Sequence, residues 1–253
     1  MSRGIFARGA LTRYSRWNIR FVDVSCHRLT LMDVEAIWLT ARLAVATTAI
    51  LLAIAVPLAW WITSERGLAR VLVQAIVGLP LVLPPTVLGF YLLILLGPVT
   101  APGRLLVRIL GHPLAFSFEG LLVGSLIYSM PFAVQPLVTG FAAIDRSYLE
   151  AAAGLGASPW RIFRSVVLPL ARGSVLTSAV LTFTHTVGEF GVVLMLGGNI
   201  PGTTRTLSIS LYDQVQDFNY AAANRTALLL LLVALVALIA IYSRRTARRG
   251  DLV

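Results

Sequence analysis

Five long apolar stretches limit what this chain can fold into more than any other feature. They cover residues 36–63, 71–97, 120–144, 173–196 and 224–243. The hydrocarbon core of a bilayer is about 30 Å thick and is crossed by about 20 apolar residues in one helix. Of the 253 residues, 57% are hydrophobic and 13% are charged, whereas about a quarter of a soluble domain is charged. The sequence therefore predicts an all-α membrane protein with about five transmembrane helices.

The positions of the arginines predict how these helices cross the membrane. Short cytoplasmic loops carry an excess of basic residues. Arginines gather in the loop after the first span, in the loop 145–170 and in the tail 244–253. In a five-span chain these three regions share one side of the membrane. We therefore expect the loop 145–170 and the C-terminal tail to be cytoplasmic.

The absence of lysine limits the chemistry of the chain. All of its basic residues are arginines, whereas the common phosphate-binding loop needs a Lys to reach the terminal phosphates of ATP. If ATP drives this protein, a partner hydrolyses it. The arginines are spread in short groups between apolar spans, which indicates contact with membrane lipid and no nucleic-acid binding. No cofactor is predicted, and the single Cys26 cannot form an intramolecular disulfide.

The first 31 residues do not fit the predicted orientation. They contain six arginines and would have to lie outside, yet they lack the apolar core and cleavage site of a signal peptide. One interpretation is an Arg-rich extension on the membrane surface, and the other is a true translation start at Met32. We favour the start at Met32, which gives a transmembrane domain over 32–243.

Three prolines interrupt the second span. Pro80, Pro84 and Pro85 lie in its middle, where each removes a backbone donor and disfavours helix in the preceding residue. Free carbonyls in a bilayer are tolerated only against protein or a water-filled cavity. The sequence thus predicts either a bent helix that lines a pathway or a plain packing kink.

The fourth span contains two ionisable residues. His185 and Glu189 are four residues apart, which places them on one face of a continuous helix. Ionisable groups within a membrane are candidates for function, so both are candidates for a pathway or gate. An intramembrane metal-dependent enzyme is the alternative from another class, but a metal site needs at least a third ligand and none is predicted.

The loop 145–170 has a composition unlike that of the spans. Its central stretch, "YLEAAAGLGASPWRIFRSVVLPLARG", predicts a short helix that ends at Gly154 and Gly156. A second helix then starts with Ser158 as its cap and Pro159 as its first residue. Small side chains in such a loop would let the backbone of another protein approach closely, and an ordinary cytoplasmic loop is the alternative.

This spacing resembles a cytoplasmic motif in permease subunits of bacterial ABC importers. The motif reads E-A-A, three residues, G, nine residues, I, one residue, L-P, with Val166 here in place of Ile. The resemblance implies a type I ABC importer permease (MetI-like) architecture with cytoplasmic coupling helices in the bacterial inner membrane. It also implies two cytoplasmic ATP-binding subunits, a second permease copy and an external binding protein. The residues that would contact the ATP-binding subunit are Glu150, Ala151, Ala152, Gly156, Leu168 and Pro169.

Two further segments resemble the molybdate permeases of this superfamily. They are "LPLVLPPTVLGFYLL" in the second span and "GEFGVVLMLGGNIPGTTRTLSISLYDQVQ" after the fourth. The resemblance implies a molybdate importer subunit that is not itself an enzyme and that receives molybdate from an external molybdate-binding protein. A sulfate or tungstate permease remains the near alternative, and a structural or regulatory membrane subunit that does not transport is another.

Overall fold

The computed structural model describes residues 33–250, and side chains up to residue 243. This part of the chain is helical, with no strand among the described residues, as the sequence predicts. The expected extension 1–31 and the alternative start at Met32 lie outside the described residues, as do the last three residues of the tail.

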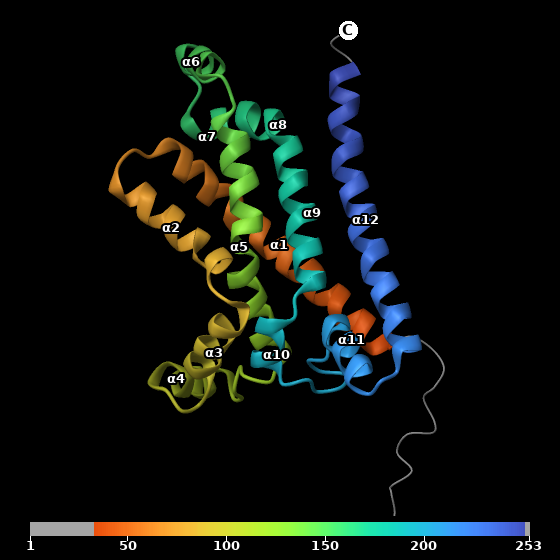
Figure 1. Cartoon of the computed structure of the whole chain (residues 1–253). Coiled ribbons are helices and arrows are strands. Elements are labelled where there is room, and N and C mark those ends of the chain that lie inside the picture. The colour runs from red at the N-terminus through yellow and green to blue at the C-terminus, as the bar shows by residue number, and fades with distance from the viewer. Residues whose placement is uncertain (1–32, 251–253) are drawn as a thin grey trace, which may run out of the picture. The chain divides into compact units, whose positions relative to one another are not determined.

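Twelve α-helices and one π-helix make up the described chain (Figure 1). In Figure 1, α6, α7 and α8 lie at one end of the helices, and α3, α4, α10 and α11 lie at the other. The elements are α1 Val34–Ser64, α2 Leu68–Val82, α3 Pro85–Leu96, α4 Ala101–Leu110, α5 Phe118–Ala142, α6 Arg146–Gly154, α7 Pro159–Ile162, the π-helix η1 Phe163–Val167, α8 Leu168–Leu170, α9 Arg172–Gly188, α10 Gly191–Gly197, α11 Leu207–Gln216 and α12 Tyr220–Gly250.

Three of these helices, α1, α5 and α12, are long and apolar enough to cross a membrane alone. Two bent pairs raise the number of candidate spans to five. One pair is α2 with α3, bent by 110°, and the other is the segment Pro159–Leu170 with α9, bent by 71°. The structure thus has between three and five candidate spans where the sequence predicts about five.

The second span is broken, as its prolines predict, but only two of them lie at the break. α2 ends at Val82, Leu83 is extended with ψ of 136°, and Pro84 caps α3 before Pro85 begins it. Pro80 lies inside α2. A proline at the start of a helix costs no hydrogen bond because that N–H would have no helical partner anyway.

The fourth span departs from the continuous helix that the sequence predicts. α9 ends at Gly188, Glu189 is extended with ψ of 131°, and α10 begins at Gly191. Each glycine is about 1 kcal/mol less favourable than Ala inside a helix, so a break costs least here. The prediction that His185 and Glu189 share one helical face is therefore wrong, because Glu189 lies beyond the end of α9.

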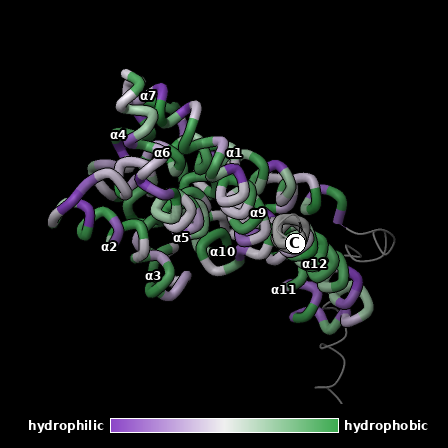
Figure 2. Tube along the Cα trace, turned by 90° about the horizontal axis from the view of Figure 1, so that it is seen from above, coloured by the Kyte–Doolittle hydropathy of each residue, from purple (hydrophilic) through white to green (hydrophobic). Residues whose placement is uncertain are grey.

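The core of the described chain is formed where α1, α5 and α9 pack against one another. Leu51 of α1 and Leu137 of α5 are fully buried there. The Ser178 hydroxyl of α9 donates to the Ala133 carbonyl of α5 at 2.7 Å. In the view of Figure 2, α12 lies beside α9 and α11, and its own apolar side chains are mostly exposed. An exposed apolar helix of this kind requires lipid or another protein around it.

Candidate functional site: an exposed helical turn and a buried polar cluster

The loop 145–170 folds as the two short helices that the sequence predicts. Asp145 caps α6 by accepting a hydrogen bond from the backbone N–H of Ser147 at 2.9 Å, and this bond lowers the pKa of the Asp145 carboxyl. α6 ends at Gly154 and is followed by a turn at position 156, where a φ of +79° favours glycine. The Ser158 hydroxyl then caps α7 by accepting from the Arg161 N–H. Local capping and glycine chemistry therefore define this turn.

The side chains on the turn around Gly156 are exposed and mostly small, but two of them are large and apolar. Leu155 is 90% exposed and Trp160 is 69% exposed, and the motif gave no reason to expect this. Together they add apolar area to this surface. Of the motif residues, Ala152 and Leu168 are half-buried, and the exposed ones are Glu150, Ala151, Gly156 and Pro169.

The turn is anchored to the spans through Phe163. This residue begins the π-helix η1 and is buried, as is Val167 at the end of η1. The Phe163 ring centroid lies 5.6 Å from that of Trp60 of α1 and 6.3 Å from that of Phe141 of α5. Trp160 stacks on the same ring at 5.6 Å. Short π-helical segments occur frequently at functional sites, and this one fixes the exposed turn to two long helices.

The breaks in the second and fourth spans meet. A Cβ added to Gly191, at the start of α10, would lie 2.8 Å from the Cβ of Pro85, at the start of α3. Further along, a Cβ on Gly89 of α3 would lie 2.8 Å from the Cβ of Met195 of α10. Only glycine allows such an approach, so α3 and α10 pack as one pair directly beyond the two breaks. The structure thus brings Pro84 and Pro85 to the segment of Glu189, while Pro80 stays within α2.

The Glu189 side chain is buried between helices. It is 3% exposed, and one carboxylate oxygen accepts a hydrogen bond from the Ser125 hydroxyl of α5 at 2.7 Å. Its other oxygen has no partner in the part of the chain that the structure describes. A buried polar group without a partner costs about 1–3 kcal/mol. The arrangement is therefore costly for a side chain buried between helices.

His185 also hydrogen-bonds to α5, at a serine one helical turn from Ser125. Its Nδ1 lies 2.9 Å from the Ser129 hydroxyl of α5, and Ser129 also lies 3.1 Å from the Thr186 hydroxyl. The His185 ring stacks on Phe132 with centroids 3.9 Å apart. Neither α5 serine was among the predicted site residues, although two serines four residues apart in an apolar span predict a polar face.

Among the side chains of residues 33–243, no third metal-binding group joins this pair. Over the described residues, no group of three or more His, Cys, Asp and Glu side chains converges. His185 and Glu189 instead have hydroxyl partners on α5. The arrangement supplies hydrogen bonds that hold the end of α9 to α5.

An all-helical membrane domain with two paired helix breaks and an exposed, anchored turn is the fold of an ABC importer permease. The described structure aligns with that of the MetNI methionine ABC transporter with a TM-score of 0.67 at 20% identity, covering 85% of this chain and 95% of that one. This likeness confirms the predicted MetI-like fold.

The sequence identifies the family. Residues 38–248 match the binding-protein-dependent transport system inner membrane component family, and the chain belongs to it. It is 48% identical to the molybdenum transport system permease protein ModB of Azotobacter vinelandii, over 86% of this chain and 96% of that protein. It is 33% identical to ModB of Haemophilus influenzae, over 83% of this chain and 91% of that protein.

Proposed function

We propose that this chain is the permease subunit of an ABC importer that moves molybdate across the bacterial cytoplasmic membrane. Similarity to two molybdenum transport permeases over most of their length supports the substrate. The observation that carries the proposal is the exposed turn at Gly156. Phe163 anchors this turn to two spans, which suits a permease that is driven by a separate ATP-binding subunit.

The turn would contact a cytoplasmic ATP-binding subunit. Two such subunits, a second permease copy and an external molybdate-binding protein would complete the importer. The Arg-rich loop and tail favour a cytoplasmic C-terminus. Small side chains allow close approach, Glu150 offers one charged acceptor for orientation, and Leu155 and Trp160 add apolar contact. The residues assigned to this contact are Glu150, Ala151, Ala152, Gly156, Leu168 and Pro169.

The paired helix breaks would form the gate of the pathway. α3 and α10 pack on each other beyond the breaks, so they can move together relative to α2 and α9. Small residues or helix ends absorb such changes in many hinges. Pro84 and Pro85 on one side and Glu189 on the other would serve as hinge residues, with Pro80 and His185 next to them in their spans.

Transport into proteoliposomes tests this proposal. The chain is reconstituted with its ATP-binding subunit, and the molybdate-binding protein is placed outside. We expect uptake of molybdate that needs both ATP and the binding protein, and that stops with an ATP-binding subunit unable to hydrolyse ATP. Absence of uptake, while the complex assembles and hydrolyses ATP, would reject the transport function.

The same vesicles separate the alternatives. Preferential uptake of sulfate or tungstate would identify a related oxyanion permease. A structural or regulatory subunit would bind the ATP-binding subunit without any uptake. An intramembrane metal-dependent enzyme would lose its activity on chelation and on His185→Ala, whereas we expect chelation to leave molybdate uptake unchanged.

A further inference from the structure

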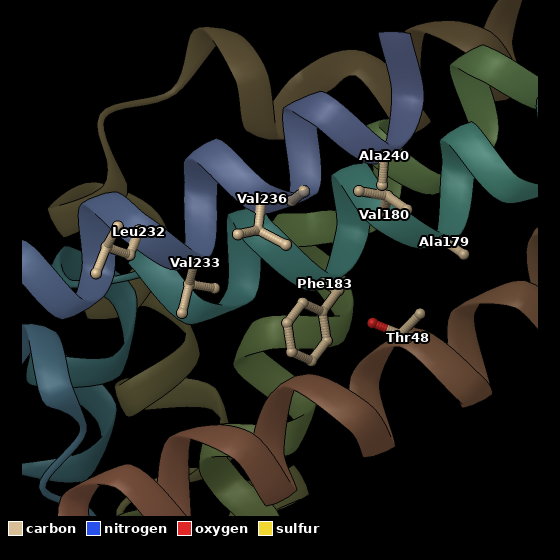
Figure 3. Close-up of a pocket in the computed structure, with 9 residues that line it drawn as sticks. Thr48, Ala179, Val180, Phe183, Leu232, Val233, Val236 and Ala240 are labelled. Atoms are coloured by element: carbon tan, nitrogen blue, oxygen red, sulfur yellow. The ribbon is translucent and has the colours of Figure 1, made fainter. Parts of the chain in front are cut away.

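An apolar groove of about 580 Å³ runs between α9 and α12 (Figure 3). Phe183 of α9 projects into it, and Val233 and Val236 of α12 line its other side. Thr48 of α1 is the one polar residue in the lining, and its hydroxyl donates to the Ala44 carbonyl of its own helix at 2.7 Å. The groove therefore offers no free hydrogen-bonding group and suits only an apolar occupant.

A second cavity of about 860 Å³ lies at the α6 end of the same two helices. Its lining is mixed, and its charged members are Arg172 of α9 and Asp145 before α6. Both are exposed, and they form no ion pair with each other in the described part of the chain. The cavity thus offers the Arg172 guanidinium and the second oxygen of the Asp145 carboxylate, whose first oxygen caps α6.

The cavity and the groove follow one another along both helices. On α9, Thr177 lines the cavity and Val180 lines the groove; on α12, Ile241 lines the cavity and Ala240 lines the groove. From Arg172 to Phe183 the rise is about 16 Å at 1.5 Å per residue. Half of a bilayer core is about 15 Å. The two spaces together therefore cover a length along α9 that is close to the depth of one lipid leaflet.

We propose that this site binds one phospholipid with a zwitterionic headgroup of the phosphatidylethanolamine type. The phosphate lies beside Arg172, the ammonium lies beside Asp145, and one acyl chain fills the groove between α9 and α12. Guanidinium groups pair well with phosphate oxygens. A primary ammonium donates hydrogen bonds to a carboxylate, which a quaternary ammonium cannot do.

The size of the groove favours an acyl chain over a helix from a second copy of this chain. A helix with its side chains is about 10 Å wide, so a 15 Å length of it occupies roughly 1,200 Å³. The groove holds about half of that volume. The two opposite charges in the cavity also match a headgroup better than they match an apolar helix. This site does not depend on the transport function proposed above.

Native mass spectrometry after reconstitution tests the lipid site. The chain is placed in vesicles of equal parts phosphatidylethanolamine, phosphatidylglycerol and phosphatidylcholine, extracted gently and weighed with its retained lipid. We expect one retained phospholipid per chain, with phosphatidylethanolamine enriched several-fold. Arg172→Gln should lower total retention about fivefold. Asp145→Asn should remove the preference and leave total retention unchanged, since Asn caps a helix as well as Asp.

A matched pair of substitutions tests the groove. Ala237→Phe on α12 fills it, whereas Ala234→Phe makes the same change on an exposed position of that helix outside the lining. We expect only the first to lose the retained lipid, with Ala237→Leu as a milder variant if the larger one does not fold. Equal retention of the three lipids by the wild type would overturn the proposal, as would full retention by a folded groove-filling variant. An efficient disulfide between copies carrying Val236→Cys would show a second copy in the groove and would also overturn it.

Discussion

Replacing Gly156 by Trp should abolish transport while leaving the spans folded. Gly156 has a φ of +79°, and a non-glycine residue in this region costs about 1–2 kcal/mol. A Cβ at this position would meet no atom within 4 Å, so no buried contact is lost. That cost is small beside the 5–15 kcal/mol that typically stabilise a domain. A tryptophan side chain at position 156 would, however, hold the ATP-binding subunit away.

Gly67→Trp is the matched control for this substitution. Gly67 lies in the loop between α1 and α2, has a φ of +113° and also has no atom within 4 Å of an added Cβ. It therefore carries backbone strain and added bulk without touching the proposed contact surface. We expect Gly67→Trp to unfold at the lower temperature, because its φ of +113° and ψ of −166° are almost restricted to glycine, and yet to keep its uptake. Gly156→Trp should lose at least nine-tenths of ATP-dependent molybdate uptake and its co-purifying ATP-binding subunit. Equal uptake by the two variants would refute the docking role of the turn.

Three buried contacts are tested by substitutions whose effect on unfolding is measured in detergent. Ser125→Ala removes the hydrogen bond to Glu189 and should lower the free energy of unfolding by about 1–3 kcal/mol; Glu189→Gln, which can still accept that bond, should cost less. Gly140→Ala places a Cβ against the Ser174 side chain and should destabilise the chain, with Ser174→Gly in the same chain restoring stability. Phe163→Ala opens a cavity in the core and should cost about 3–5 kcal/mol. An unchanged unfolding transition in Ser125→Ala, Gly140→Ala or Phe163→Ala would contradict the contact that the variant tests.

Most of this fold could be predicted from the lengths of the apolar stretches and from the residues that cap the helices. The long helices α1 and α5 follow from unbroken apolar runs, and the turn at Gly156 follows from a glycine, a serine cap and a proline in sequence. The break at Glu189 could not be predicted from the sequence. Glycines are common in membrane-spanning helices, and the close approach of Gly191 to Pro85, which favours a break here, joins distant parts of the chain. The buried carboxyl depends on Ser125, which lies 64 residues away in the chain. Such long-range pairs cannot be read from local spacing.

Helix α5 connects the exposed turn with the paired helix breaks. Near one end of α5, Phe141 contacts Phe163, which anchors the turn. Near the other end, Ser125 holds Glu189 at the break of the fourth span. The distance along the helix between Ser125 and Phe141 is about 24 Å, and α5 runs without a break through Pro131 and Pro136. If the turn moves with a bound ATP-binding subunit, a continuous helix of this length carries that displacement to Glu189, so Ser125→Ala should uncouple ATP hydrolysis from molybdate uptake as well as lower stability.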